Sequence, residues 1–406
     1  MKCALLGEKL GHSYSPQIHG YLGTYTYELQ EIQTEGLLPI LNNEEYKGFN
    51  VTIPYKKTVI KYCDALSERA AILGAVNTVV RKPNGMLVGH NTDYFGFSYM
   101  LQRTGLKVQG KKVLVLGSGG ASATAVAVLK ELGAQVVVIS RKGKDNYENI
   151  SKHADASLIV NATPVGMYPN VEASPVDISI FTQLEGVLDM IYNPARTQLI
   201  MDAQARGIVA ENGLWMLVAQ AKQSAEWFTE APISDEVIPQ IYHKMQSRME
   251  NTVLIGMPGC GKSTVGKLLA QALNKTFVDA DAEIEKAALM SIPQIFAQSG
   301  EAGFRRIETQ VLSELGKQSA LVIATGGGCV TREENYTHLH RNGKIIWIQR
   351  PIQQLPTEGR PLSQAGSVQD MYHIRKPMYE RFADITAENC CSPEETVTHI
   401  LETGGF

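Results

Sequence analysis

The 406-residue chain lacks long apolar runs, a dominant charge and paired cysteines. Its apolar stretches fall well short of the roughly 18 to 20 residues that a membrane helix needs, so we expect no membrane partner. A formal net charge of −3 gives no general attraction for nucleic acid, which usually binds to a basic domain. The segment MKCALLGEKLG begins directly on a strand-like run without a leader-type apolar core. We therefore expect a cytoplasmic protein.

The six cysteines are scattered and form no CxxC pair. In a chain of this length the pattern predicts reduced thiols rather than a disulfide framework or a zinc site. Cys260 stands inside a glycine loop, where we interpret it as a small residue that fills the loop.

Apolar runs alternate with helical patterns along almost the whole chain, which is typical of parallel α/β sheets. One series of strands opens with KCALLG, a second with KKVLVLG at Lys111, and a third with TVLIGMPG at Thr252. In the first series, PNG predicts the turn of a hairpin. The length predicts two or three domains.

The clearest motif is GMPGCGKS, from Gly256 to Ser263, which satisfies GxxxxGK[ST] between a strand and a helix. Such glycines allow backbone N–H groups to converge on phosphate oxygens at a helix N-terminus. The pattern predicts that Lys262 reaches the β- and γ-phosphates and that Ser263 holds Mg²⁺.

Charged residues follow the neighbouring strands of this third series. Asp279 and Asp281 end the strand TFVDAD, where parallel sheets bind ligands, although a helix N-cap would explain one of them. Arg305 and Arg375 suit the bidentate binding of a small carboxylate. Arg360, in GRPLS, is predicted to lie on a loop that carries it toward the transferring phosphate.

The order GMPGCGKST, DAD, GFRRIE, ATGGG, GRPLS and RKPMY resembles shikimate kinase across residues 251–406. The resemblance implies ATP and Mg²⁺, with catalytic roles for Lys262, Asp281 and Arg360, and metal contacts from Ser263 and Asp279. It implies shikimate contacts from Asp281, Arg305, Gly327 and Arg375, with Glu308 supporting the substrate arginine. It implies nucleotide contacts from Gly259, Cys260, Gly261, Lys262, Ser263, Thr264 and Arg360.

A second glycine turn, from Gly117 to Ser122, follows a strand and opens a helix, as a dinucleotide fingerprint should. The next strand ends in Ser140-Arg141-Lys142 without an acid. An acid there would bind the ribose 2′-hydroxyl of NAD, whereas Arg141 suits the 2′-phosphate of NADP. An ordinary solvated basic turn is the alternative interpretation.

Two short segments before this turn carry candidate chemistry. In GHSYSP, Ser15 is predicted to cap a helix whose first residue is Pro16, which leaves Ser13 available for binding. Lys56 in NVTIPYK and Asp93 in GHNTD would form a proton-transfer pair beside a nicotinamide. Without further context, two such residues are more often surface charges.

The ordered segments GHSYSP, NVTIPYK, GAVNT, GHNTD, GSGGAS, NATPVGM, DMIYNP and NGLWMLVAQA resemble shikimate dehydrogenase across residues 1–249. The resemblance implies that Lys56 and Asp93 are catalytic. It implies substrate contacts from Ser13, Ser15, Thr52, Lys56, Asn77, Asp93, Tyr192 and Gln220. It implies NADP(H) contacts from Gly117, Gly119, Gly120, Ala121, Ser140, Arg141, Thr163, Met190 and Gly213.

Together the two resemblances imply an α/β protein of three parts. We predict a substrate-binding domain at residues 1–95, completed by helices at about 214–249, a Rossmann-like NADP-binding domain at 96–213, and a P-loop kinase domain with a parallel sheet at 250–406. The implied protein is a bifunctional enzyme that reduces 3-dehydroshikimate with NADPH and phosphorylates the shikimate with ATP. We expect small-molecule substrates and a monomer or weak dimer.

Two alternatives stay open at this point. One is a regulatory protein that senses shikimate and nucleotides without turnover. The other is an NAD-linked quinate or shikimate dehydrogenase joined to a kinase for another small acid.

Overall fold

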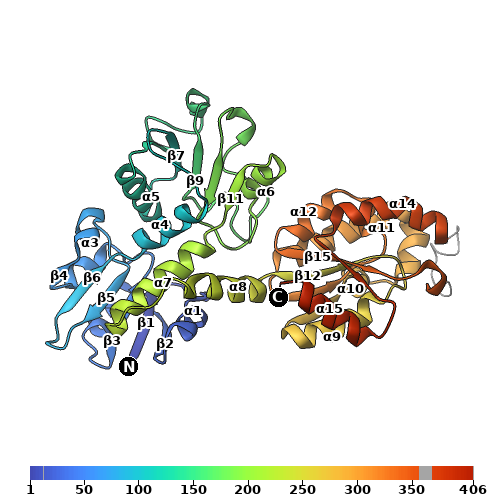
Figure 1. Ribbon diagram of the computed structural model, residues 1–406, viewed down its shortest axis with the longest axis horizontal. Coiled ribbons are helices and arrows are strands. Elements are labelled where there is room, and N and C mark those ends of the chain that lie inside the picture. Colours follow the sequence, from blue (N-terminus) through green and yellow to red (C-terminus); the bar gives the residue numbers. More distant parts are fainter. Residues whose placement is uncertain (12, 356–367, 406) are drawn as a thin grey trace. The chain divides into compact units, whose positions relative to one another are not determined.

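The computed structural model describes residues 1–11, 13–355 and 368–405 (Figure 1). The chain divides into two compact units. Unit 1 comprises Met1–Tyr192 and Thr197–His243, and unit 2 comprises Asn193–Arg196 and Lys244–Phe406. Both are α/β structures, which confirms the predicted fold class. The boundaries of the three predicted domains stay a prediction.

The first sheet of unit 1 is mixed, with the strand order β2-β1-β3-β5-β6-β4. Its strands are β1 (Lys2–Gly7), β2 (Thr26–Glu31), β3 (Tyr46–Val51), β4 (Ala65–Leu66), β5 (Thr78–Arg81) and β6 (Leu87–His90). β1 is parallel to β2 and β3, whereas β5 is antiparallel to β3 and β6. The β5–β6 hairpin turns at Gly85, whose φ of 86° favours glycine, and this confirms the predicted hairpin.

Helices α1 (Ser15–Leu22), α2 (Leu37–Leu41) and α3 (Glu68–Leu73) belong to the same part of unit 1. The prediction that Ser15 caps α1 is wrong, because the helix begins at Ser15 and Tyr14 is its N-cap residue. The Ser15 N–H donates to Ser13 Oγ at 3.3 Å. Thus Ser13, rather than Ser15, provides the oxygen that satisfies a donor at this helix start.

The second sheet of unit 1 is fully parallel, with the order β11-β10-β9-β7-β8. Its strands are β7 (Lys112–Leu116), β8 (Gln135–Ile139), β9 (Leu158–Asn161), β10 (Gly186–Asp189) and β11 (Val209–Glu211). The accompanying helices are α4 (Asp93–Arg103), α5 (Gly120–Glu131), α6 (Gln198–Ala205) and α7 (Leu214–Thr229). α4 packs against both α5 and α7, and α7 also contacts β3 and β5 of the first sheet.

Unit 2 contains a parallel sheet with the order β13-β14-β12-β15-β16. Its strands are β12 (Asn251–Ile255), β13 (Thr276–Asp279), β14 (Leu321–Ala324), β15 (Gly343–Gln349) and β16 (Ile385–Glu388). Its helices are α9 (Lys262–Leu273), α10 (Ala280–Ala288), α11 (Ile292–Lys317), α12 (Glu334–His340), α14 (Val368–Phe382) and α15 (Pro393–Thr403). α9 and α15 cover one face, and α11, α12 and α14 cover the other (Figure 1). Helix α8 (Val237–Met249) precedes β12.

Unit 2 also includes a short segment that is distant in sequence, Asn193–Arg196. The Ala195 N–H donates to Asn342 Oδ1 at 2.7 Å, and Arg196 donates to the carbonyl of His340 at 2.8 Å. Arg196 also lies 3.2 Å from the carboxylate of Glu250, which is only 4% exposed. This segment therefore neutralises a buried charge of the unit.

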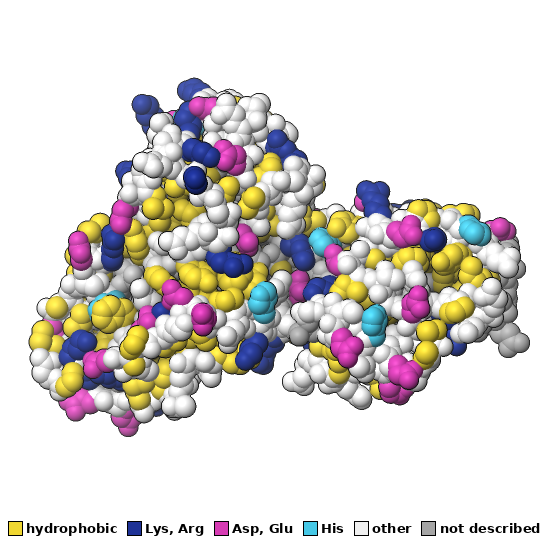
Figure 2. All heavy atoms as spheres, viewed as in Figure 1, with side chains coloured by type: hydrophobic (Ala, Val, Ile, Leu, Met, Phe, Trp, Pro, Cys, Tyr) yellow, Lys and Arg dark blue, Asp and Glu magenta, His cyan; other side chains and the backbone are white. Residues whose placement is uncertain are grey.

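Within the described ranges, no helix is both long and apolar enough to cross a membrane. On the face drawn in Figure 2, acidic and basic side chains are interspersed among polar and apolar ones.

Candidate functional sites

Lys56 and Asp93 form an ion pair in unit 1. Lys56 lies in the turn after β3, and Asp93 is the first residue of α4, where the helix N-terminus favours a carboxylate. Lys56 Nζ lies 2.6 Å from Asp93 Oδ2, and Asn77 Nδ2 donates to Asp93 Oδ1 at 2.9 Å. Both carboxylate oxygens therefore have a donor. The interpretation of Lys56 and Asp93 as separate surface charges does not describe this arrangement.

A buried polar network fixes Asn77 behind this pair. Asn77 Oδ1 accepts the Thr92 N–H at 2.7 Å, and Thr92 Oγ1 lies 3.0 Å from Ser224 Oγ on α7. Ser224 also accepts from Asn50 Nδ2 of β3 at 2.8 Å. Buried polar groups that are all paired hold one geometry, and these residues therefore orient the amide that contacts Asp93.

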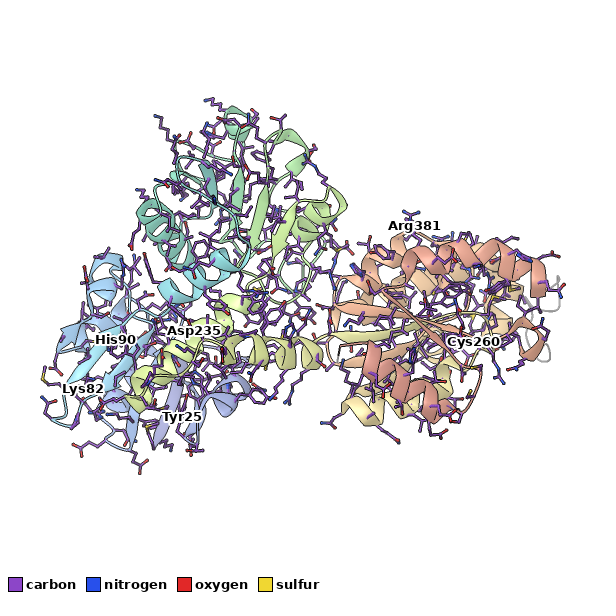
Figure 3. The ribbon with its side chains drawn as sticks, in the orientation of Figure 1. Tyr25, Lys82, His90, Asp235, Cys260 and Arg381 are labelled. Carbon is purple, nitrogen blue, oxygen red and sulfur yellow. The ribbon has the colours of Figure 1, made fainter. Side chains whose placement is uncertain are left out.

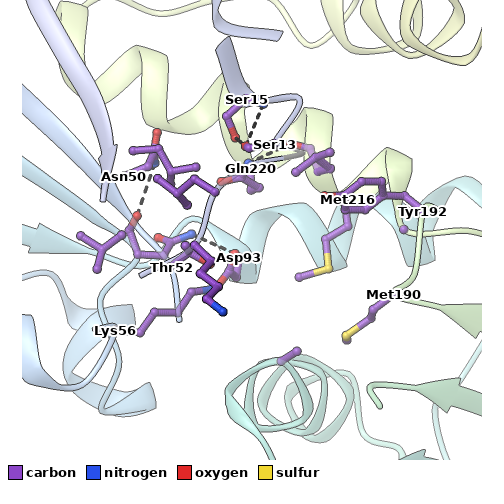
Figure 4. Close-up of a pocket in the computed structure, with 18 of the residues that line it drawn as sticks. Ser13, Ser15, Asn50, Thr52, Lys56, Asp93, Met190, Tyr192, Met216 and Gln220 are labelled. Atoms are coloured by element: carbon purple, nitrogen blue, oxygen red, sulfur yellow. Dashed lines mark hydrogen bonds and ion pairs between the residues drawn. The ribbon is translucent and has the colours of Figure 1, made fainter. Parts of the chain in front are cut away.

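The pair lies in a cavity of about 540 Å³ (Figure 4). The structure brings every substrate residue predicted within residues 1–249 into its lining, namely Ser13, Ser15, Thr52, Lys56, Asn77, Asp93, Tyr192 and Gln220. In Figure 4, Met190, Tyr192 and Met216 lie on the side away from Lys56. Ala121, Met190 and Gly213, predicted to contact the cofactor, also line the cavity. The sequence did not indicate Lys9, Asn50, Met216 or Leu217.

The remaining predicted cofactor residues lie at the carboxyl ends of β7, β8 and β9, outside this cavity lining. They are Gly117, Gly119, Gly120, Ser140, Arg141 and Thr163. Gly117 has φ 106°, and a Cβ there would stand 3.0 Å from the carbonyl oxygen of Ala162, so this turn requires glycine. Among the described atoms, nothing lies within 4 Å of a Cβ built at Gly119 or Gly120, so the turn is open at the start of α5.

The serine of this turn and a glycine before α7 each have a local structural reason. Ser122, at the third position of the fingerprint, is buried and donates to the Gly117 carbonyl at 2.7 Å. At Gly213, a Cβ would stand 2.2 Å from the Met190 carbonyl oxygen. The residues present therefore fit a dinucleotide whose phosphates approach the backbone at the N-terminus of α5.

In unit 2 the P-loop joins β12 to α9. Gly256, Gly259 and Gly261 have φ values of 143°, 82° and 99°, which favour glycine. Lys262 is 8% exposed, and its Nζ donates to the carbonyls of Gly256 at 2.9 Å and Met257 at 3.1 Å. The loop is thus closed by the same lysine that is predicted to reach the phosphates.

Cys260 lies inside unit 2 (Figure 3), and its side chain is fully buried, as expected for a residue that fills the loop. Asn389, which follows β16, donates to its carbonyl at 2.7 Å. Gly259, Gly261, Lys262, Ser263 and Thr264 line the adjoining cavity, whereas Cys260 does not.

Asp279 joins the P-loop helix to α10. Its Oδ2 accepts from Ser263 Oγ at 2.8 Å, and its Oδ1 accepts from the Asp281 N–H at 3.1 Å. Asp279 therefore caps α10 and contacts Ser263 at the same time. A hydroxyl and a carboxylate are oxygen ligands that suit Mg²⁺. Among the described residues no group of three or more His, Cys, Asp or Glu could hold a metal ion, so a cation here would also need phosphate or water oxygens.

Asp281 faces the glycine turn that follows β14. Burial, together with the nearby charge of Asp279, raises the pKa of the Asp281 carboxyl. A Cβ at Gly326 would stand 2.8 Å from Asp281 Oδ1. A side chain at this glycine would therefore displace the carboxylate.

Arg305 of α11 lies beside the same turn. Its Nη1 is 2.7 Å from Glu308 Oε2, and Glu308 is 1% exposed. A Cβ at Gly328 would stand 2.1 Å from Arg305 Nη2. Arg375 of α14 donates to the Gly327 carbonyl at 3.2 Å. The turn thus brings the two predicted carboxylate-binding arginines together.

These residues line a cavity of about 560 Å³. Sequence reasoning missed its apolar wall and one cation, namely Ile292, Pro293, Phe296, Phe304 and Arg350. The rings of Phe296 and Phe304 are stacked with centroids 4.8 Å apart. Their spacing of eight residues could have indicated one helix face, but α11 is interrupted at Gly300, whose φ is 64°. The predicted Arg360 lies outside the described residues.

Comparison with known proteins finds a different family match in each unit. A model of the shikimate kinase family matches residues 258–404, and a model of the shikimate dehydrogenase substrate binding domain matches residues 5–79. An NADP(+) shikimate dehydrogenase of Caldicellulosiruptor bescii is 36% identical over 270 residues, which cover 59% of this chain and 93% of that protein.

Solved structures give the same result for the first unit. Shikimate dehydrogenase 1 of Peptoclostridium difficile is 38% identical with a TM-score of 0.55, covering 60% of this chain and 97% of that one. A quinate dehydrogenase of Corynebacterium glutamicum in complex with NAD is 26% identical with a TM-score of 0.56, covering 61% of this chain and 99% of that one.

Proposed function

Because the chain belongs to the shikimate dehydrogenase family and carries a shikimate kinase domain, we propose that it performs two consecutive reactions on one ring acid. Unit 1 reduces 3-dehydroshikimate to shikimate with NADPH. Unit 2 then phosphorylates shikimate with ATP to shikimate 3-phosphate. The observation that carries this proposal is a pair of cavities, one lined by Lys56 and Asp93 and the other by Lys262 and Asp281.

In unit 1, bound NADPH supplies the hydride. The Lys56 ammonium donates a proton to the ketone oxygen as the carbonyl carbon is reduced, and the resulting amine regains a proton from solvent. Asp93, whose Oδ2 lies 2.6 Å from Lys56 Nζ, orients the ammonium before the transfer. Ser13 and Ser15 bind the substrate carboxylate through their hydroxyls.

In unit 2, Asp281 accepts the proton of the attacking hydroxyl. Its raised pKa makes it a stronger base than an ordinary aspartate. Lys262 and the backbone N–H groups of the P-loop neutralise the phosphates, while Arg305 and Arg375 bind the carboxylate of the ring acid. Such catalysis consists mainly of positioning and charge neutralisation.

Mg²⁺ is the metal that this site would use. The Ser263 hydroxyl would bind the ion directly, and Asp279 would contact the outer coordination shell of the ion. The ion would neutralise charge on the transferring phosphates. Arg141 supports a preference for NADP over NAD, because its guanidinium suits the ribose 2′-phosphate. We further propose a cytoplasmic protein that is a monomer or a weak dimer and binds no nucleic acid.

The proposal is tested by product identification with the purified full-length chain. With 3-dehydroshikimate, NADPH, ATP and Mg²⁺, mass spectrometry should detect shikimate 3-phosphate. Without ATP the reaction should stop at shikimate, and with shikimate and ATP alone it should give the phosphate without NADPH oxidation. Turnover of neither substrate would favour a regulatory sensor.

A second experiment tests the remaining alternative, in which unit 1 is an NAD-linked quinate or shikimate dehydrogenase. The 26% identical quinate dehydrogenase in complex with NAD is the reason to include quinate and NAD in this test. Initial rates are measured for shikimate and quinate, each with NADP and NAD. We expect the highest kcat/KM for shikimate with NADP. A higher value for quinate with NAD would overturn the assignment of unit 1.

A further inference from the structure

Arg350 is a cation in the kinase cavity to which the sequence assigned no role. It directly follows β15 and lines the cavity together with the P-loop. Its Nε is buried without a hydrogen-bond partner, and no ion pair of Arg350 occurs in the described part of the chain. A buried donor left unpaired costs about 1–3 kcal/mol, so its retention in a cavity indicates a ligand.

The other cations of this cavity each have at least one partner, although the Nε of Arg305 is also buried without a hydrogen bond. Lys262 donates to the carbonyls of the P-loop, Arg305 pairs with Glu308, and Arg375 donates to the carbonyl of Gly327. Arg350 is thus the cavity cation that has no partner among the described residues. An anionic ligand would satisfy it.

The order of the strands places Arg350 on the nucleotide side of the cavity. The P-loop follows the central strand β12, whereas Asp281 and the triple-glycine turn follow β13 and β14 on one side of it. Arg350 follows β15 on the opposite side of β12. Along the edge of the sheet, Arg350 is therefore closer to the P-loop than to Asp281 and the triple-glycine turn, which are expected to bind shikimate.

Contacts at the end of β15 hold this position against the P-loop. The Ile348 carbonyl oxygen lies 2.4 Å from where a Cβ of Gly256 would stand. The Gln349 carbonyl accepts the Asn389 N–H at 2.7 Å, and Asn389 in turn donates to the Cys260 carbonyl at 2.7 Å. The backbone that carries Arg350 thus packs closely against Gly256 at the start of the loop that is expected to bind phosphates, and is linked through Asn389 to Cys260 near its end.

We propose that Arg350 binds phosphate oxygens of the nucleotide in unit 2. This inference rests on the kinase half of the proposed function and adds a residue to its site. A planar guanidinium presents parallel N–H donors that match two oxygens of one phosphate, which a lysine cannot reproduce.

The test compares Arg350→Met and Arg350→Lys with the wild-type full chain. Loss of a charge-assisted hydrogen bond predicts a KM for ATP raised roughly 10- to 100-fold in Arg350→Met. Arg350→Lys should give an intermediate value, and the KM for shikimate should change less than twofold. Reduction of 3-dehydroshikimate in the same sample reports that the chain is folded.

Arg381→Met is the matched control. Arg381 lies on α14 of the same unit (Figure 3), its side chain is 68% exposed, and it pairs with Glu333 at 2.6 Å. It does not line the nucleotide cavity, so both kinase constants should stay at their wild-type values.

Calorimetric titration with ADP and with inorganic tripolyphosphate identifies the group that Arg350 contacts. Both dissociation constants should rise by a similar factor in Arg350→Met. If ADP binding weakens and tripolyphosphate binding does not, the guanidinium contacts the nucleoside and the inference is overturned. A raised KM for shikimate alone, or unchanged constants in an active wild-type kinase, would overturn it as well. Absence of phosphorylation in the wild type would refute the proposed function instead.

Discussion

Removal of the Lys56 ammonium gives the most direct test of the reductase site. General acid catalysis contributes about 10²- to 10⁴-fold to a rate. The 2.6 Å contact to Asp93 and the position of Lys56 in the cavity lining make it the candidate donor. We therefore expect Lys56→Met to lower kcat for reduction by about 100- to 10,000-fold, equivalent to about 2.7–5.4 kcal/mol at 1.36 kcal/mol per factor of ten.

The same substitution also has a stability cost, which must be separated from catalysis. Asp93 is 9% exposed, and without Lys56 its carboxylate keeps only the Asn77 donor at 2.9 Å among the contacts described above. A poorly compensated charge of this kind costs about 1–3 kcal/mol. A double variant, Lys56→Met with Asp93→Asn, removes this unpaired charge. Its thermal stability should return toward that of the wild type, but its rate of reduction should stay low.

The assay follows NADPH oxidation and shikimate phosphorylation in one preparation, with thermal unfolding measured alongside. Phosphorylation should remain within twofold of wild type in both variants, because the kinase residues belong to the other unit. Groups that act as one unit lose activity non-additively, so the double variant should be no slower than Lys56→Met within error. Reduction by Lys56→Met within tenfold of the wild-type rate would refute the role of Lys56 as the acid.

Three further results are expected for the kinase. Lys262→Ala should lower phosphorylation by roughly 100-fold or more and leave NADPH oxidation unchanged; equal loss of both rates would argue against separate sites. The pKa of the Asp281 carboxyl is raised, and its protonated form cannot accept a proton from the attacking hydroxyl. In a pH–rate profile, kcat/KM for phosphorylation should therefore fall as the pH decreases, with a midpoint above the ordinary aspartate pKa of about 3.9. Gly328→Ala places a Cβ 2.1 Å from Arg305 Nη2 and should raise the KM for shikimate about tenfold, whereas an unchanged KM would mean that Arg305 does not hold the substrate.

The strands that the sequence predicted best are those with continuous apolar runs. β7 and β12 are buried over nearly their whole length. Parallel strands that are buried on both faces appear in a sequence as continuous apolar runs, which are easy to recognise. β11 has three residues and β16 alternates in burial, so neither produces a comparable signal. Their positions depend on neighbouring strands rather than on local sequence.

The candidate sites divide in the same way between local and long-range information. The P-loop is readable because its glycines, Lys262 and Ser263 are consecutive and each follows from local backbone geometry. Lys56 and Asp93 are 37 positions apart, and only a family resemblance indicated that they meet. The contact between Asn50 and Ser224 spans 174 positions and could not be inferred from spacing. Arg350 was missed because nothing near it in sequence marks it as unpaired.

The segment Asn193–Arg196 affects any attempt to express the kinase alone. A recombinant fragment that starts at Lys244 would omit four residues that group with it. Glu250, which is 4% exposed, would then lose the Arg196 guanidinium that lies 3.2 Å away. Asn342 Oδ1 would lose the hydrogen bond at 2.7 Å that it accepts from the Ala195 N–H. A single truncation point therefore does not separate the two units cleanly. A truncated kinase needs a replacement for Arg196 to be as stable as it is in the intact polypeptide.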